Sequence, residues 1–98
     1  MQLVVVERQF DEPFDIDGFE DIRKGGKWCY DLYRVRYLKT YFSTDRRRMI
    51  CLYEAPDAEA VRQVSRQLGA PFERVWAADE YERPPGEDRH RLVNRGST

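Results

Sequence analysis

The sequence predicts an α+β domain of the ferredoxin-like class, with elements in the order β-α-β-β-α-β. Short β-branched or aromatic runs indicate four strands, at residues 3–8, 36–42, 47–54 and 73–81. Apolar residues spaced three and four apart indicate two helices, at residues 16–33 and 56–68. The two middle strands are separated by a short polar turn, Ser43-Thr44-Asp45-Arg46, and therefore form a hairpin. Two β-α-β halves joined by a hairpin give a four-stranded antiparallel sheet with both helices on one face.

Local signals justify the first strand and the first helix. Leu3-Val4-Val5-Val6 is a β-branched apolar run, typical of a buried central strand. Asp17 and Glu20 have the spacing of a capping box, so we expect the helix to begin close to them. Gly25-Gly26 lies within the helical pattern, where glycine is unfavourable. Either the helix breaks there, or the glycines allow close packing against the sheet.

The second helix has signals at both ends. Pro56 suits the first helical position, since its fixed φ is already helical and its missing N–H is not needed there. Gly69 suits the position just after the helix, where a left-handed backbone is common. Between them, Val61, Val64 and Leu68 form the stripe that we expect to be buried.

The two hairpin strands predict a sheet face that is aromatic and partly polar. Side chains alternate along a strand, and one face then carries Tyr37, Lys39, Tyr41, Met49, Cys51 and Tyr53. Ile50 and Leu52 point the other way and suit the face under the helices. A large bare apolar face usually marks an interface or a ligand site. We therefore expect a two-fold homodimer that packs sheet on sheet as a closed barrel.

Composition limits the domain organisation and the classes of partner. The 98 residues fit one domain, 1–81, followed by a charged segment, 82–98, that contains Pro84-Pro85-Gly86 and that we expect to be flexible. The 17 basic and 18 acidic residues nearly cancel, which argues against a nucleic-acid partner. No apolar run reaches the length of about 20 residues that a membrane span requires. No signal-peptide pattern is present, so we expect a cytoplasmic protein.

Two segments resemble a family of small bacterial proteins of uncharacterised function. They are YLKTYFS at residues 37–43 and MICLYEAPDAEAVR at residues 49–62. VVERQF at residues 5–10 and GAPFERV at residues 69–75 also fit the family pattern, so the likeness extends over most of the expected domain. A described member of this family binds nickel and has a dimeric ferredoxin-like fold. The resemblance therefore implies this dimeric fold and a divalent metal, nickel, as ligand.

The residues themselves offer candidates for a binding site. The ligand-binding candidates are Glu7, Lys39, Tyr41, Cys51 and Tyr53. For a metal ion, Glu7, Cys51 and His90 would supply a carboxylate, a thiolate and an imidazole. Each also has a plainer interpretation. Glu7 would be a strand-end carboxylate paired with Arg8 or Arg36, Cys51 a packing residue, and His90 a solvated side chain between two arginines.

These candidates favour a small ligand- or metal-binding protein. Two other functions stay open. One is a dimeric α/β-barrel enzyme of monooxygenase or isomerase type, in which Glu7, Lys39, Tyr41 and Tyr53 would transfer protons. The other is a regulatory module whose segment from Glu82 onward binds a partner. The sequence contains no Ser-His-Asp set, Gly-rich phosphate loop or paired-cysteine motif, so binding is preferred over catalysis.

Overall fold

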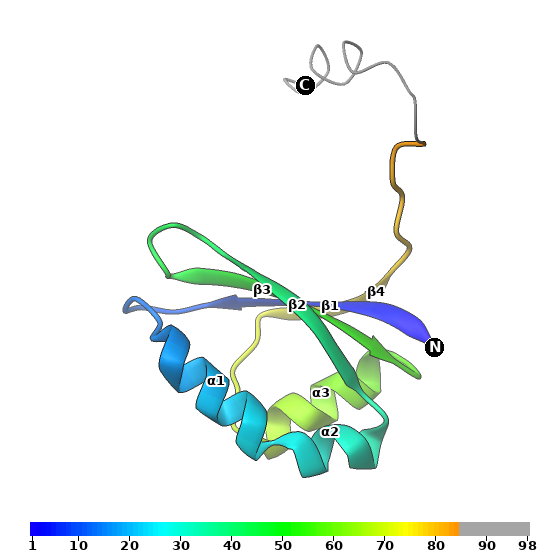
Figure 1. The fold of residues 1–98 in the computed structure, drawn as a ribbon, viewed down its shortest axis with the longest axis horizontal. Coiled ribbons are helices and arrows are strands. Elements are labelled where there is room, and N and C mark those ends of the chain that lie inside the picture. Colours follow the sequence, from blue (N-terminus) through cyan, green and yellow to red (C-terminus); the bar gives the residue numbers. More distant parts are fainter. Residues whose placement is uncertain (85–98) are drawn as a thin grey trace.

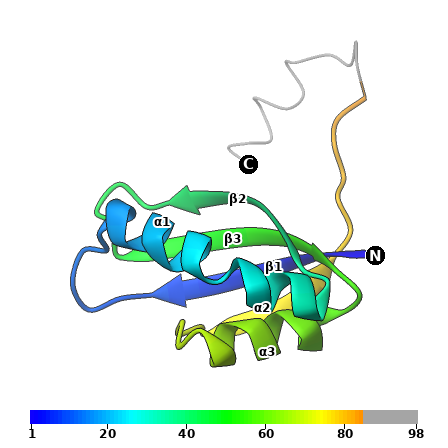
Figure 2. The same cartoon turned by 60° about the horizontal axis from the view of Figure 1, so that its bottom comes forward.

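The computed structural model describes residues 1–84 and confirms the predicted ferredoxin-like α+β fold. Its strands are β1 (Gln2–Gln9), β2 (Arg36–Phe42), β3 (Arg48–Ala55) and β4 (Arg74–Ala78). Its helices are α1 (Ile16–Gly25), α2 (Lys27–Tyr33) and α3 (Ala58–Gln67). The strands form one antiparallel sheet in the order β2-β3-β1-β4. All three helices lie on the same side of this sheet (Figure 1, Figure 2).

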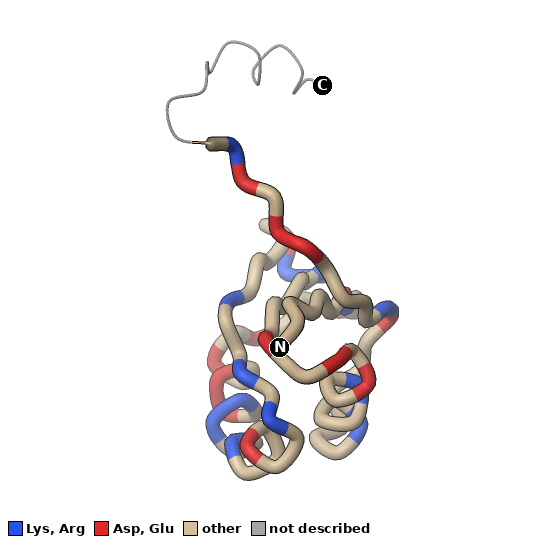
Figure 3. The backbone as a smooth tube through the Cα atoms, turned by 90° about the vertical axis from the view of Figure 1, so that its right-hand side faces the viewer, with Lys and Arg blue, Asp and Glu red and all other residues tan. Residues whose placement is uncertain are grey.

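The C-terminal segment was expected at residues 82–98. Its residues 85–98, which include His90, lie outside the described residues. The division at residue 81 therefore stays a prediction. After β4 the described chain leads away from the sheet (Figure 3). Within residues 1–84, no helix has both the length and the apolar character needed to cross a membrane.

The first predicted helix is divided in two at Gly26. The backbone N–H of Gly26 donates to the Ile22 carbonyl at 3.0 Å and so completes α1. The Gly26 carbonyl accepts from the N–H groups of Cys29 and Tyr30, at 2.9 and 3.1 Å, and so begins α2. A Cβ placed on Gly26 would lie 2.5 Å from Cδ1 of Leu68, just beyond α3. The helix therefore breaks and also packs closely, but against the end of α3 rather than against the sheet.

Both N-terminal caps differ from the predicted positions. Asp15, not Asp17, caps α1, and its carboxylate accepts from the N–H of Asp17 at 3.1 Å. Asp57 caps α3 by accepting from the N–H of Ala60 at 2.8 Å, so Pro56 precedes the cap instead of opening the helix. In both cases the cap is an aspartate with an extended backbone, the conformation that lets its side chain reach the first free N–H groups. The C-terminal prediction for α3 is confirmed, since Gly69 has a φ of 68°.

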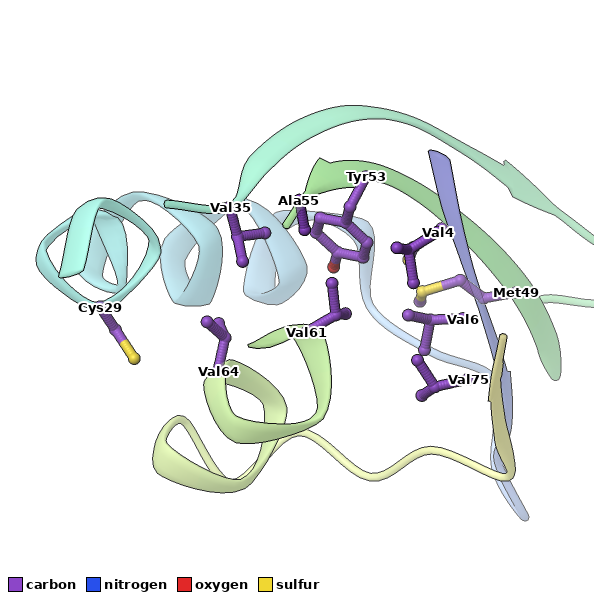
Figure 4. Packing of buried hydrophobic residues seen from close by; sticks show 11 residues of the cluster. Val4, Val6, Cys29, Val35, Met49, Tyr53, Ala55, Val61, Val64 and Val75 are labelled. Atoms are coloured by element: carbon purple, nitrogen blue, oxygen red, sulfur yellow. The ribbon is translucent and has the colours of Figure 1, made fainter. Parts of the chain in front are cut away.

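The prediction assigned the two faces of the sheet the wrong way round. Met49, Cys51 and Tyr53 point toward the helices and are buried, with Met49 only 2% exposed. Figure 4 shows Met49 and Tyr53 directed from the sheet toward Val61 of α3. Ile50 and Leu52 lie on the face that no described helix covers. Alternation along β3 separates two sets of apolar side chains, but pairing with the neighbouring strand β1 decides which set joins the core.

A bulge in β2 also divides the predicted aromatic face. Tyr37 pairs with Tyr53, but the next pair in the ladder joins Lys39 to Leu52, which leaves Leu38 as an extra residue. Beyond this bulge, Lys39 and Tyr41 share the face of Leu52. Tyr37 instead packs edge-on against Phe19 of α1 and against Tyr53.

Candidate functional site

The five predicted ligand-binding residues lie on two different faces of the sheet. Glu7, Lys39 and Tyr41 lie on the side without helices, whereas Cys51 and Tyr53 point into the core. The prediction that Lys39, Tyr41, Cys51 and Tyr53 share one face is therefore wrong, because the sheet itself separates Lys39 and Tyr41 from Cys51 and Tyr53. Their individual roles stay predictions.

The face without helices, here called the open face, presents three rows of side chains across the four strands. From β2 to β4 these rows are Tyr41-Ile50-Glu7-Arg74, Lys39-Leu52-Val5-Trp76 and Arg36-Glu54-Leu3-Ala78. Large apolar groups reach the surface here, with Trp76 45% and Ile50 42% exposed. The open face thus combines a wide apolar area with charged groups at its edges.

Glu7 lies on the inner strand β1 of the open face, between Ile50 of β3 and Arg74 of β4. Its Oε2 accepts a hydrogen bond from Nε1 of Trp76 at 2.7 Å. Neither of the predicted arginine partners contacts it: Arg36 pairs with Glu54 at 3.3 Å, and Arg8 points to the opposite side of the sheet. Glu7 and Tyr41 both line a surface groove of about 260 Å³ beside the β2–β3 turn. This groove brings together two of the predicted site residues.

A second cavity, of about 70 Å³, lies between the sheet and the helices. Its lining includes Arg8, Tyr30, Tyr53, Val61, Ser65 and Leu68, and we call it the Arg8 pocket. Arg8 is only 7% exposed. Its Nη1 donates to the carbonyl oxygen of Pro71 at 2.7 Å, and its Nη2 donates to the Tyr53 hydroxyl at 3.3 Å. The pocket therefore places a buried guanidinium beside a buried phenol.

The Arg8 pocket keeps its guanidinium charged and its phenol neutral. Burial raises the pKa of Tyr53 well above its ordinary value, and the nearby Cys51 thiol adds to this effect, although the charge of Arg8 opposes it. Burial by itself would lower the pKa of Arg8, but the neighbouring Tyr53 and Cys51 outweigh it and the pKa is raised. At neutral pH the pocket consequently holds a charged guanidinium beside the neutral hydroxyl of Tyr53.

Sequence reasoning did not select Arg8 as a site residue. The sequence indicates Arg8 only as a partner for Glu7. A signal was nevertheless present in the sequence. Val4, Val6 and Arg8 share one face of the first predicted strand, and Val4 and Val6 belong to the run predicted to be buried. A charged residue that continues a buried alternation is expected to reach a functional or structural partner inside the fold.

The described residues do not fit a nickel site within one copy of the chain. Residues 1–84 contain no group of three or more His, Cys, Asp or Glu side chains placed to hold a metal ion. Cys29 and Cys51 are both free and fully buried, on different elements. Cys51 accepts a hydrogen bond from the Thr40 hydroxyl at 3.4 Å, and Glu7 lies on the opposite side of the sheet. Glu7 and Cys51 cannot bind the same ion in one copy.

The strand order and the one-sided helices place this chain in the class of ferredoxin-like α+β domains. The chain belongs to the family described as "Nickel responsive protein SCO4226-like", whose model matches residues 5–77. The family resemblance noted in the sequence is thereby confirmed.

A solved structure supports the same fold. The crystal structure of SCO4226 from Streptomyces coelicolor A3(2) superposes with a TM-score of 0.72 and covers 82% of this chain and 99% of that chain. The sequences are 15% identical, so this likeness shows the fold alone. No curated protein matches the sequence.

The Tyr53 hydroxyl gives a testable pH dependence. We expect Tyr53→Phe to lower the free energy of unfolding at neutral pH by about 1–3 kcal/mol, because a buried donor of Arg8 loses its acceptor. Above about pH 10, tyrosine ionises in the unfolded chain while Tyr53 in the fold remains protonated. The stabilisation linked to its raised pKa is therefore present below that pH and is lost as the pH rises further. Urea unfolding of wild type and variant across this range should show a shallower alkaline decline for Tyr53→Phe.

Tyr41→Phe is the matched control, because Tyr41 is exposed on the open face. We expect it to leave both the neutral stability and the alkaline slope unchanged. Identical alkaline slopes for wild type and Tyr53→Phe would contradict the role given to the buried hydroxyl.

Proposed function

We propose that this chain is a small metal-binding protein that binds a divalent ion, nickel being the first candidate, as a homodimer. The observation that carries this proposal is membership of the nickel-responsive family across residues 5–77. The match includes β2 and β3 in full and most of β1 and β4, so it relates the domain as a whole and not a single motif.

The distribution of ligand groups indicates how such a site would be built. Because one copy brings no ligand cluster together within residues 1–84, donors are required from a second copy or from beyond residue 84. A two-fold axis through the open face would present every ligand twice, including the carboxylate of Glu7. Carboxylate, imidazole and water are ligands that nickel accepts in proteins. Glu7 and His90 are therefore the first residues to test.

The open face supports the dimer. It exposes Tyr41 and Ile50 on neighbouring strands and Trp76 on β4, across strand β1, and exposed apolar surface of this kind is typical of protein interfaces. Pairing of two open faces would cover these groups and would place the Glu7 side chains near the contact. We propose sheet-to-sheet pairing as the dimer geometry.

Calorimetric titration of the tag-free chain with nickel, zinc and copper salts tests this function, together with its mass in solution. We expect saturable nickel binding with a Kd of about 1 μM or lower at a fixed ratio per dimer. Glu7→Gln keeps an oxygen for Trp76 but removes the charge, and should weaken nickel binding at least about tenfold, or about 1.4 kcal/mol. Glu54→Gln, on the same face but paired with Arg36, is the control.

Two further outcomes decide the placement of the site. If a chain shortened after residue 84 kept full nickel affinity, His90 would be excluded as a nickel ligand. An intact dimer that releases no heat with any of the three metals would refute the proposal. The family relationship would then indicate a shared fold but not a shared function.

A further inference from the structure

Arg8 carries a buried charge that no carboxylate neutralises within residues 1–84. Its three hydrogen bonds go to neutral oxygens, namely the carbonyls of Ala70 and Pro71 and the hydroxyl of Tyr53. None of the ion pairs formed by the described residues includes Arg8. Buried charges are normally paired, because removal from water is costly unless an opposite charge compensates. A guanidinium has five N–H donors, so Arg8 retains donors for an anionic acceptor.

The cavity beside this guanidinium has mostly apolar walls, and Tyr30, Tyr53 and Ser65 are the lining residues with a hydroxyl group. The lining includes Val61, Val64 and the buried Ser65 of α3, and Leu68, which directly follows α3. Ile22 and Pro71 also belong to the lining and are exposed, so the cavity reaches the surface between α1 and the segment after α3. A ligand that enters here would meet the charge of Arg8 at one end and apolar groups along its side. Arg23 also belongs to the lining, but it is paired with Glu20 at 2.8 Å.

The size of the cavity selects the ligand class. At about 70 Å³ it has roughly half the volume of the 150 Å³ engineered cavity that holds benzene. An aromatic ring is therefore too large, whereas a chain of a few carbons fits. A carboxylate is also a group whose two oxygens match the fork of an arginine.

We propose that the Arg8 pocket binds a short-chain monocarboxylate of the size of acetate or propionate. The carboxylate accepts hydrogen bonds from the Arg8 guanidinium, and the alkyl end lies against Val61, Val64 and Leu68. This site lies on the opposite side of the sheet from the open face, so it does not depend on nickel. The anion would supply the negative charge that the protein itself does not place beside Arg8.

Propionate and its neutral amide form the decisive comparison on the wild-type chain. The protein is titrated with sodium propionate and with propionamide at constant ionic strength, while the NMR signals of the Tyr30 and Tyr53 rings and the Val61 and Val64 methyl groups are followed. We expect propionate to shift these signals with a Kd at least tenfold lower than that of propionamide, a difference of about 1.4 kcal/mol. Benzoate should bind more weakly than propionate. Equal affinity for propionate and propionamide would overturn the proposal.

Three variants locate the site. Arg8→Met should abolish the preference for propionate over propionamide. Ser65→Leu fills the cavity and leaves Arg8 in place, so it should weaken propionate binding at least about tenfold even if Arg8→Met does not fold. Arg36→Met, on the open face, should leave the affinity unchanged. Undiminished propionate binding in a folded Ser65→Leu variant would exclude the Arg8 pocket.

Discussion

Met49→Ala is expected to lower the free energy of unfolding by about 2–5 kcal/mol, because it removes a large buried side chain and leaves a cavity. Met49 is 2% exposed and lies among the buried residues between the sheet and α3 (Figure 4). Its neighbours Val6 and Val61 belong to secondary-structure elements, so the site cannot collapse freely around the missing atoms. Urea unfolding at neutral pH measures the loss.

Ile50→Ala is the control for this prediction, one residue further along the same strand. Ile50 lies on the open face and is 42% exposed, so we expect a loss of about 1 kcal/mol or less for the isolated chain. Unfolding at several protein concentrations separates this loss from weakened pairing between copies, which makes the midpoint depend on concentration. A larger loss for Ile50→Ala than for Met49→Ala in the monomer would mean that the two faces of β3 are reversed.

Gly26→Ala is expected to be the second large effect, with a loss of about 1–3 kcal/mol from overpacking. Gly26 has a φ of −93°, which any L-residue adopts, so backbone strain does not contribute. The cost arises because the new methyl group would lie 2.5 Å from Cδ1 of Leu68 and 3.2 Å from the backbone oxygen of Ile22. Leu68 is half-buried and also lines the Arg8 pocket, so its side chain relieves part of this contact by moving into that cavity, whereas the backbone oxygen of Ile22 is fixed within α1. Thermal or urea unfolding measures the change.

Gly25→Ala provides the matched control, since a Cβ on Gly25 would have no neighbour within 4 Å. Alanine is the better helix former, so this variant should be neutral or more stable by up to about 1 kcal/mol. A double-mutant cycle identifies the contact: in a Leu68→Ala background, Gly26→Ala should cost little. An equal cost of Gly26→Ala in both backgrounds would show that the contact with Leu68 is not its cause.

The helices and strands could be predicted because their signals are local. The β-branched run at residues 3–6 forms strand β1, and the glycine at residue 69 follows α3 in the expected left-handed conformation. The caps were displaced by two residues or fewer because residue types suited to a helix start lie close together at the beginning of α1 and α3. At residues 15–17, for example, Asp15 and Asp17 are both suitable by residue type, and only the backbone conformation decides between them.

The candidate site was less predictable. Glu7 and Tyr41 do lie together on the open face, but Cys51 and Tyr53 lie on the other side of the sheet. The bulge at Leu38 reverses the alternation within β2, and neither Gly nor Pro marks it in the sequence. Arg8 was not selected because its burial depends on the carbonyl groups of Ala70 and Pro71, which are more than 60 residues away in the chain.

The sequence alone was sufficient to predict the order of the strands and helices, the antiparallel hairpin and the family. These features depend on residues that are neighbours in the chain. Tertiary structure alone decided which apolar set of β3 entered the core, where the helix junction packed, and that Arg8 became a buried cation beside Tyr53. The physical reason is that burial depends on the surface that approaches from elsewhere in the chain. Alternation along a strand distinguishes its two faces, but only the packing of α3 and the neighbouring strands determines which face leaves water.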